Sequence, residues 1–205
     1  MKLTEPTIFI LLFIITLFST NAKAEDWPQW RGSNRDGISK EKDLLEEWPK
    51  DGPPLSWKIK GLGIGFSSLA VMEGKLYTLG DLKDGSYAIT LDEKNGNLLW
   101  KTRIGEAGGH RGYPGTRSTP TVDKGQVFTL NQHSDLVCLD ANSGKLIWQK
   151  NLVTDFGGKM MSGWKYSESP LVDSDQIICT PGGKDGTLVA LNRKTGSKIW
   201  QTKEW

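Results

Sequence analysis

The stretch ALNRKTGSKIW, residues 190–200, decides the fold of this chain. It recurs as TLDEKNGNLLW at 90–100 and as CLDANSGKLIW at 138–148. In each copy an Asp or Asn stands four positions before a glycine, and a tryptophan stands four positions after that glycine. Self-similarity at a period of about 50 residues is typical of repeat architectures, so we expect a chain built from like units.

Each unit contains short apolar runs bounded by Gly, Asp, Asn and Ser, which indicates short strands joined by tight turns and requires no helix. In the second unit we expect strands near 117–123, 126–131, 135–140 and 145–151. The turn DANSG suits an Asp side chain that accepts backbone N–H groups, followed by Gly144 in the left-handed conformation. Four strands per repeated unit predict an all-β propeller made of four-stranded antiparallel blades.

The expected blades cover about 66–103, 117–151 and 167–203 of a propeller that occupies residues 54–205. The strand 54–59 around Trp57 precedes them and is expected to be unpaired or to pair abnormally. Three blades form an incomplete ring, because a propeller needs about four to eight. We therefore interpret the sequence as the N-terminal part of a longer protein, with a three-blade arc closed by self-association as the alternative.

Three sequence features point to a known family. The pattern A-x-D/N-x-x-T-G-x-x-x-W at 190–200 resembles the tryptophan-docking motif of the PQQ-like (pyrroloquinoline quinone repeat) β-propeller family. That family includes quinoprotein dehydrogenase propellers and the outer-membrane assembly lipoprotein. The opening DWPQWRGSNRDGIS, together with SESPLV and TPGGKDGTLVALNRKTG, resembles secreted PQQ-binding-like propeller proteins of planctomycete-type bacteria. The resemblance spans residues 26–203.

The resemblance also implies a role for the repeated tryptophans. In the family, the tryptophan of each blade stacks between the first residue of its own motif and the glycine-containing turn of the next blade. We therefore expect these side chains to hold neighbouring blades together rather than to bind a ligand. The structural docking residues are Trp57, Trp100, Trp148 and Trp200, with Gly96, Gly144 and Gly196.

Residues 1–24 are expected to form a signal peptide: Lys2 precedes an apolar stretch, and Ala22 and Ala24 give small-x-small spacing. The apolar stretch is too short to span a bilayer comfortably, and no lipobox cysteine follows it. We therefore expect a periplasmic or secreted protein, with no membrane span after signal removal. Residues 25–53 are interpreted as an N-terminal lead segment before the propeller.

The composition excludes one class of partner. The chain carries a net charge of +2, and its lysines are scattered through the turns, so no basic stripe for nucleic acid is present. Cys138 and Cys179 both stand in motif or apolar positions. We interpret them as small buried side chains, while a disulfide in an exported protein is the alternative.

The sequence offers little chemistry. A quinoprotein dehydrogenase needs a calcium ion and an Asp base, and in its alcohol-oxidising branch two adjacent cysteines, which this chain lacks. His110 and His133 stand at no catalytic or metal-ligand spacing. The Gly-rich stretch 105–117 is interpreted as a mobile rim loop rather than an anion site. We predict no catalytic residue, metal site or cofactor in this chain.

One pocket is predicted from propeller geometry. The innermost strand of each blade starts near the central channel, so Arg117 and Glu168 should face it, with Trp164 close by. A cation, an anion and an indole at one mouth are typical of a polar-ligand pocket, and a structural ion pair is the alternative. Lys184 and Asp185 in GGKDG form a lesser candidate pair at a loop tip.

These observations predict an exported, non-catalytic scaffold or binding protein of the PQQ-like repeat family, with protein or carbohydrate partners. The alternative is a PQQ-dependent quinoprotein oxidoreductase whose catalytic residues lie in a further C-terminal part. PQQ and calcium would be cofactors only under that alternative.

Overall fold

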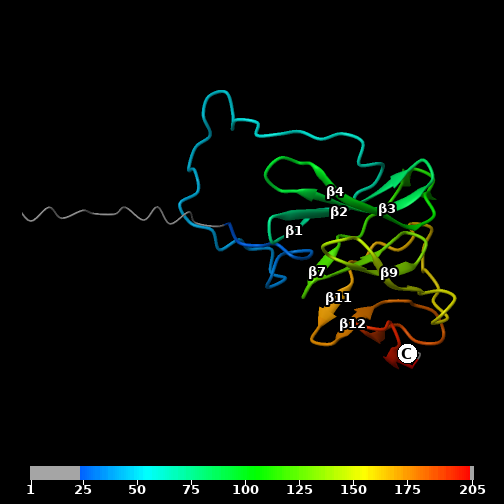
Figure 1. Cartoon of the computed structure of the whole chain (residues 1–205). Coiled ribbons are helices and arrows are strands. Elements are labelled where there is room, and N and C mark those ends of the chain that lie inside the picture. Colours follow the sequence, from blue (N-terminus) through cyan, green and yellow to red (C-terminus); the bar gives the residue numbers. More distant parts are fainter. Residues whose placement is uncertain (1–23, 204–205) are drawn as a thin grey trace, which may run out of the picture.

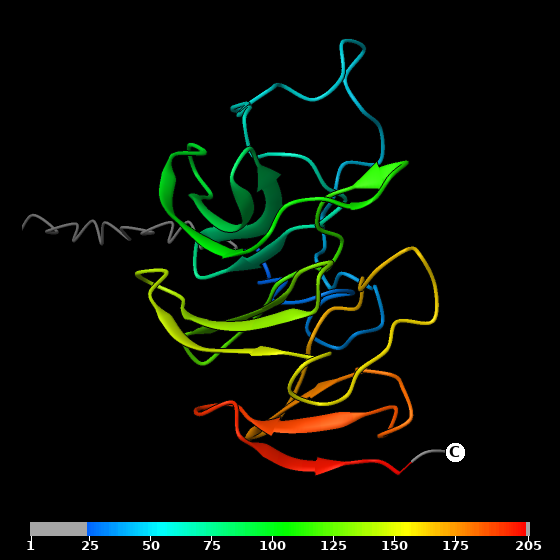
Figure 2. The ribbon, with the colours of Figure 1, turned by 90° about the vertical axis from the view of Figure 1, so that its right-hand side faces the viewer.

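The structure is a computed structural model that describes residues 24–203. The expected signal peptide, apart from its last residue, therefore lies outside the described residues. Three four-stranded antiparallel sheets and one two-stranded sheet make up the described part, which contains no helix. The sheets stack in chain order (Figures 1 and 2). The predicted all-β architecture of four-stranded propeller blades is confirmed.

In each sheet the strands follow one another in chain order, from an innermost to an outermost strand. The first sheet contains β1 (Ala70–Met72), β2 (Lys75–Leu82), β3 (Gly85–Asp92) and β4 (Leu98–Gly105). The second contains β7 (Thr121–Asp123), β8 (Gln126–Leu130), β9 (Asp135–Asp140) and β10 (Leu146–Asn151). The third contains β11 (Leu171–Asp173), β12 (Gln176–Cys179), β13 (Val189–Asn192) and β14 (Lys198–Gln201). The two-stranded sheet pairs β5 (Gly109–His110) with β6 (Tyr113–Pro114).

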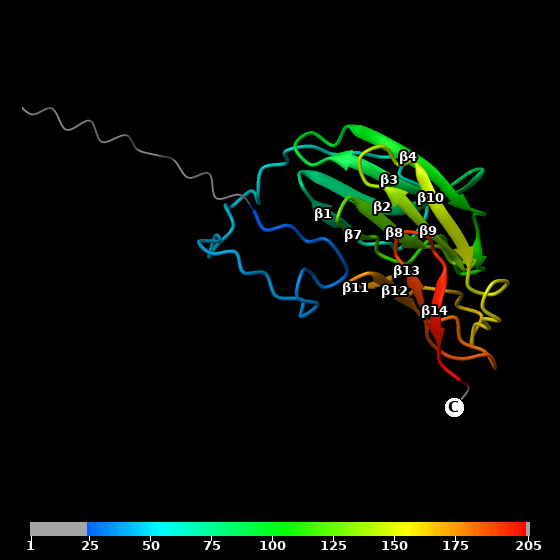
Figure 3. The same ribbon diagram turned by 60° about the horizontal axis from the view of Figure 1, so that its bottom comes forward.

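The innermost strands lie side by side. Strand β7 contacts both β1 and β11, and Figure 3 shows these three strands at one side of the stack with the outermost strands β4, β10 and β14 at the other. Each blade therefore presents its first strand to a shared inner edge, as the strands around a propeller axis do.

The innermost strand of the second blade is shorter than the sequence predicts. It begins at Thr121 rather than near residue 117. Pro120 has no N–H to pair with β8, and the Thr119 N–H donates to the Ser169 hydroxyl, 2.9 Å away, before the third sheet. The segment that precedes β7 thus connects two blades instead of extending one.

The core lies between the sheets. One buried cluster joins the first and second sheets, through side chains such as Leu79 and Val127. Another joins the second and third sheets and contains both Cys138 and Cys179. Both thiols are free, and burial raises the pKa of Cys138 to about 12. The cysteines are therefore buried apolar side chains of the core and not a bridge.

Three tryptophans dock on the turn of the following sheet. The Trp148 indole Nε1 donates to the Arg193 carbonyl, 2.8 Å away, and a Cβ added to Gly196 would lie 2.9 Å from the Trp148 ring. Within its own sheet Trp148 lies opposite Cys138, the first residue of its motif. Trp100 repeats this arrangement with Ala141 and Gly144, and Trp57, which precedes the first sheet, makes the same indole contacts with Glu93 and Gly96. Each blade is thereby joined to the next.

The repeated turn explains the spacing of the motif. The Asp140 carboxylate accepts the backbone N–H groups of Asn142 and Ser143, at 3.2 and 2.8 Å, and hydrogen bonds from Ser143 lower the pKa of Asp140. Gly144 then takes a φ of +68°, and a Cβ there would lie 2.5 Å from the Trp100 ring. Glycine is therefore required both by the backbone conformation and by the docked indole.

Trp200 differs from the other motif tryptophans. Its Nε1 donates to the Gln176 side chain of its own sheet, 3.0 Å away, and its side chain is 38% exposed. In the described range no glycine-containing turn lies against this ring. The inter-blade role expected of Trp200 is thus not seen, because docking needs the turn of a following blade.

Candidate functional site

The first part of the lead segment crosses all three blades. Residues 26–38 pass along the innermost strands, on the side where Figure 3 shows the lead segment beside β1, β7 and β11. The contacts are Trp27 with Val71 of β1, Pro28 with Val122 of β7, and Arg35 with Val172 of β11. The sequence indicated only a lead segment here, since no strand pattern predicts where it docks.

A cavity of about 570 Å³ lies between this segment and the blades. We call it the axial cavity. Its volume falls in the range of small-molecule sites. The segment contributes Trp30, Arg31 and Arg35, and the stretches before the innermost strands contribute Phe66, Arg117 and Glu168.

The structure brings Arg117 and Glu168 to the same cavity without pairing them. Within residues 24–203 the ion pairs join other residues, namely Arg103 with Glu106 and Arg193 with Asp123. The Arg117 guanidinium and the Glu168 carboxylate therefore do not form the structural ion pair that the sequence suggested as an alternative.

Each of the two groups has a local partner. The Arg117 Nη2 donates to the Tyr113 carbonyl, while Nη1 is buried and has no hydrogen-bond partner in the described part of the chain. The Glu168 Oε1 accepts the Thr180 N–H, 2.6 Å away. Burial raises the pKa of the Glu168 carboxyl, although the hydrogen bond from Thr180 opposes the shift.

This raised pKa gives Glu168 a measurable effect on stability. Above its ordinary pKa the unfolded carboxyl ionises while the folded one resists ionisation, so Glu168 costs stability as pH rises. Glu168→Gln removes the charge and keeps an oxygen for the Thr180 N–H. We expect the difference in free energy of unfolding, variant minus wild type, to be larger at about pH 8 than at about pH 4. Urea unfolding at both pH values measures this difference. A constant or reversed difference would contradict the assignment.

A second, smaller cavity of about 220 Å³ adjoins the first through Phe66 and Arg117. Tyr113 and Trp164 complete its lining, and Phe66, Tyr113 and Trp164 are all exposed. The ring of His110 stacks on Trp164 with centroids 4.4 Å apart. Trp164 therefore lies beside Arg117, as predicted from the repeat, within a cluster of exposed rings.

The stretch 105–117 is more ordered than a rim loop. It contains the β5–β6 hairpin, and the Gly108 N–H donates to the buried Asp81 carboxylate, 2.7 Å away. In Figure 2 this hairpin and the loop before β11 stand on the same side of the stack. The hairpin thus presents His110 and Tyr113 to Trp164.

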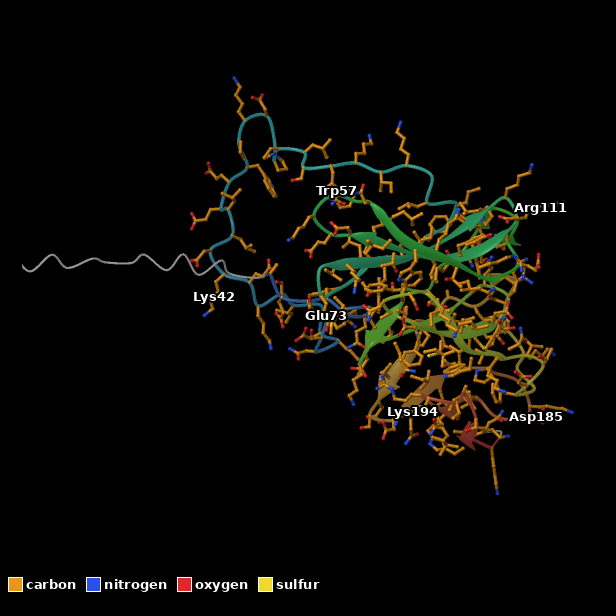
Figure 4. All side chains as sticks on the ribbon, in the orientation of Figure 1. Lys42, Trp57, Glu73, Arg111, Asp185 and Lys194 are labelled. Atoms are coloured by element: carbon orange, nitrogen blue, oxygen red, sulfur yellow. The ribbon has the colours of Figure 1, made fainter. Side chains whose placement is uncertain are left out.

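Lys184 and Asp185 do not join this site. Both are exposed, and Figure 4 shows Asp185 at the end of the third sheet opposite to the turn that carries Lys194. Lys184 lines a separate hollow with the loop 157–161. The axial cavity and this loop tip are distinct places in the fold.

Between residues 24 and 203, no group of three or more His, Cys, Asp or Glu side chains is placed to hold a metal ion. The same range contains no helix that is long and apolar enough to cross a membrane.

Solved structures share the fold. A quinohemoprotein alcohol dehydrogenase from Comamonas testosteroni matches with a TM-score of 0.65 and 20% identity, over 86% of this chain and 27% of that chain. BamB from Moraxella catarrhalis matches with a TM-score of 0.51 and 20% identity, over 72% of this chain and 39% of that chain. An enzyme and an assembly factor therefore share these blades, and the likeness concerns fold alone.

Sequence relatives carry one name, outer membrane protein assembly factor BamB. The protein from Shigella dysenteriae is 33% identical over 73% of this chain and 33% of its own length. That from Burkholderia pseudomallei is 28% identical over 71% of this chain and 34% of its own length. The matches thus span about a third of these relatives. The family profile described by the same name matches residues 57–205, so this chain belongs to the BamB-like family of PQQ-repeat β-propellers.

Proposed function

We propose that this protein is an exported, non-catalytic β-propeller of the cell envelope that binds a partner through the face around the axial cavity. The observation that carries the proposal is the meeting of Arg117, Glu168 and Trp164 with exposed rings at one mouth. The signal-like residues 1–24 support export. The name of the relatives, an outer membrane protein assembly factor, supports a role in the envelope.

The groups around the cavity favour binding over catalysis. Glu168 is held by a backbone N–H, and the Ser169 hydroxyl accepts the N–H of Thr119. Among the described residues, neither side chain hydrogen-bonds to a side-chain base or nucleophile, as the members of a catalytic pair would. Guanidinium groups and exposed rings are instead the side chains that dominate binding sites.

A quinoprotein oxidoreductase is the second candidate, and the fold shared with the Comamonas testosteroni enzyme is the observation that favours it. Adding PQQ and calcium to the protein with alcohol substrates and a redox dye separates the two candidates. Binding alone predicts no dye reduction. Dye reduction that depends on PQQ would overturn the non-catalytic proposal.

The binding role is tested with arrays of immobilised glycans and peptides. We expect the wild type to retain at least one class of probe, and Trp164→Ala to lose it while melting at the same temperature. Trp48→Ala is the matched control, because Trp48 is exposed and lines neither cavity. Retention by no probe, or equal retention by Trp164→Ala, would contradict a binding role for this face.

A further inference from the structure

The motif DWPQWRGSNRDG at the start of the lead segment has two groups of side chains. Most of its aromatic and charged residues serve the fold. The Trp27 ring packs on Gly32, and the Asp26 carboxylate accepts the Glu73 N–H. The Arg35 guanidinium donates to the Gln29 side chain and to the Val172 carbonyl. The Asp36 carboxylate accepts the Ile38 N–H. Trp30 and Arg31 have no such partner within residues 24–203, and both line the axial cavity.

The local fold fixes where these two residues lie. Gly32 takes a φ of +79°, and a Cβ there would lie 2.7 Å from the Trp27 ring, so only glycine fits. The Arg31 carbonyl accepts the Gly37 N–H at 2.9 Å, with Arg31 itself in the left-handed region at a φ of 65°. A closed, anchored loop therefore presents Trp30 and Arg31 to the cavity.

The charge of the lining favours an anion. Among the described residues that line the axial cavity, three are basic, namely Arg31, Arg35 and Arg117, and one is acidic, Glu168. Arg117 Nη1 is buried and has no hydrogen-bond partner among the described residues. Guanidinium groups bind planar anions such as carboxylates through paired hydrogen bonds.

The rings favour a flat ligand with apolar faces. Trp30 and Phe66 are exposed and line the axial cavity, and Trp164 is exposed in the adjoining one. Aromatic rings of this kind bury apolar area and leave polar edges free for hydrogen bonds. Hydroxyl groups of Thr119 and Ser167 line the same space. A sugar ring, with apolar faces and a polar edge, matches these surfaces.

An extended peptide matches them less well. A peptide that adds to a sheet needs free backbone groups at a strand edge. At the inner edge these groups are already used, since Val71 pairs with Trp27 through both N–H and C=O and the Val122 N–H donates to Pro28. A ligand at this edge would therefore contact side chains rather than free backbone groups.

We propose that the lead segment and the blades together form a binding site for an acidic saccharide. Arg31 and Arg117 bind the carboxylate of a uronic acid, and Trp30 and Phe66 stack on its ring. The site rests on the proposed binding function and names its ligand class. It also gives Trp30 and Arg31 of the opening motif a role beyond anchoring the segment.

Calorimetric titration of the full chain with tri-galacturonate tests the proposal, with the fully methyl-esterified trimer as the uncharged match. We expect the acid to bind at least tenfold more tightly than the ester, with an affinity that falls as salt is added. Arg31→Gln and Arg117→Gln should each weaken acid binding about tenfold or more and leave the ester unchanged. Arg111→Gln, at an exposed position outside both cavities (Figure 4), should change neither.

Trp30→Ala separates the stacking role from the charge. It should weaken binding of the acid and of the ester alike, because both present the same ring. Equal binding of acid and ester, or losses in Arg111→Gln as large as in Arg31→Gln, would overturn the proposal. Failure of the trimer to bind would also overturn the proposal. If the array then showed that a peptide binds and that Trp164→Ala loses it, the proposed binding function would still stand.

Discussion

Trp148→Ala is expected to lower the free energy of unfolding by about 3–5 kcal/mol. The Trp148 side chain is only 8% exposed, belongs to the cluster between the second and third sheets, and donates to the Arg193 carbonyl. Its removal leaves a cavity at the interface and an acceptor without its donor. Urea unfolding of purified protein measures the loss.

Trp200→Ala is the matched control, because Trp200 occupies the same motif position and no docking turn lies against it within residues 24–203. At 38% exposure we expect it to cost about 1 kcal/mol. Equal losses at the two positions would show that contact with the following turn contributes nothing to stability.

Arg193→Ala is expected to cost about 3 kcal/mol. Arg193 is 2% exposed, and its guanidinium donates to Asp123, to Gln126 and to the Ser174 carbonyl. It also lies over the Phe128 ring, 5.6 Å from the centroid. Removing it leaves several acceptors of two blades without a donor, which urea unfolding detects.

Asp123→Asn provides the comparison for this pair. Asp123 is partly exposed, so its charge is solvated and its loss should cost about 1 kcal/mol or less. The guanidinium keeps its other acceptors in that variant. A larger loss for Asp123→Asn than for Arg193→Ala would mean that the ion pair, rather than the bridging guanidinium, stabilises the interface.

The blades could be predicted because their information is local. Asp140 and Gly144 encode a turn within five residues of sequence, and the motif repeats often enough to place a tryptophan of the preceding blade, Trp100, on that turn. Arg193 could not be predicted in the same way. It stands at a variable position of the motif, and its partner Asp123 lies 70 residues away. Its burial depends on the packing of two blades.

The sequence predicted the residues of the candidate site that belong to the blades but not those of the lead segment. Arg117 and Glu168 were placed by the alignment of the repeats, which sets where each innermost strand begins. Trp30 and Arg31 were not, because the lead segment shows no strand periodicity that would say where it docks. Gly32 is a local signal in this motif, since glycine commonly occupies tight turns that need a positive φ.

The indole N–H resonances of a ¹⁵N-labelled sample, recorded with and without saturating tri-galacturonate, distinguish the tryptophans that join blades from those that face the ligand. The indoles of Trp57, Trp100 and Trp148 donate to the turn of a following sheet, whereas Trp30 and Trp164 line the two cavities. This arrangement predicts that the signals of Trp30 and Trp164 shift and that those of the three docked indoles stay in place. Shifts confined to the docked indoles, or no shift at Trp30 and Trp164, would contradict it.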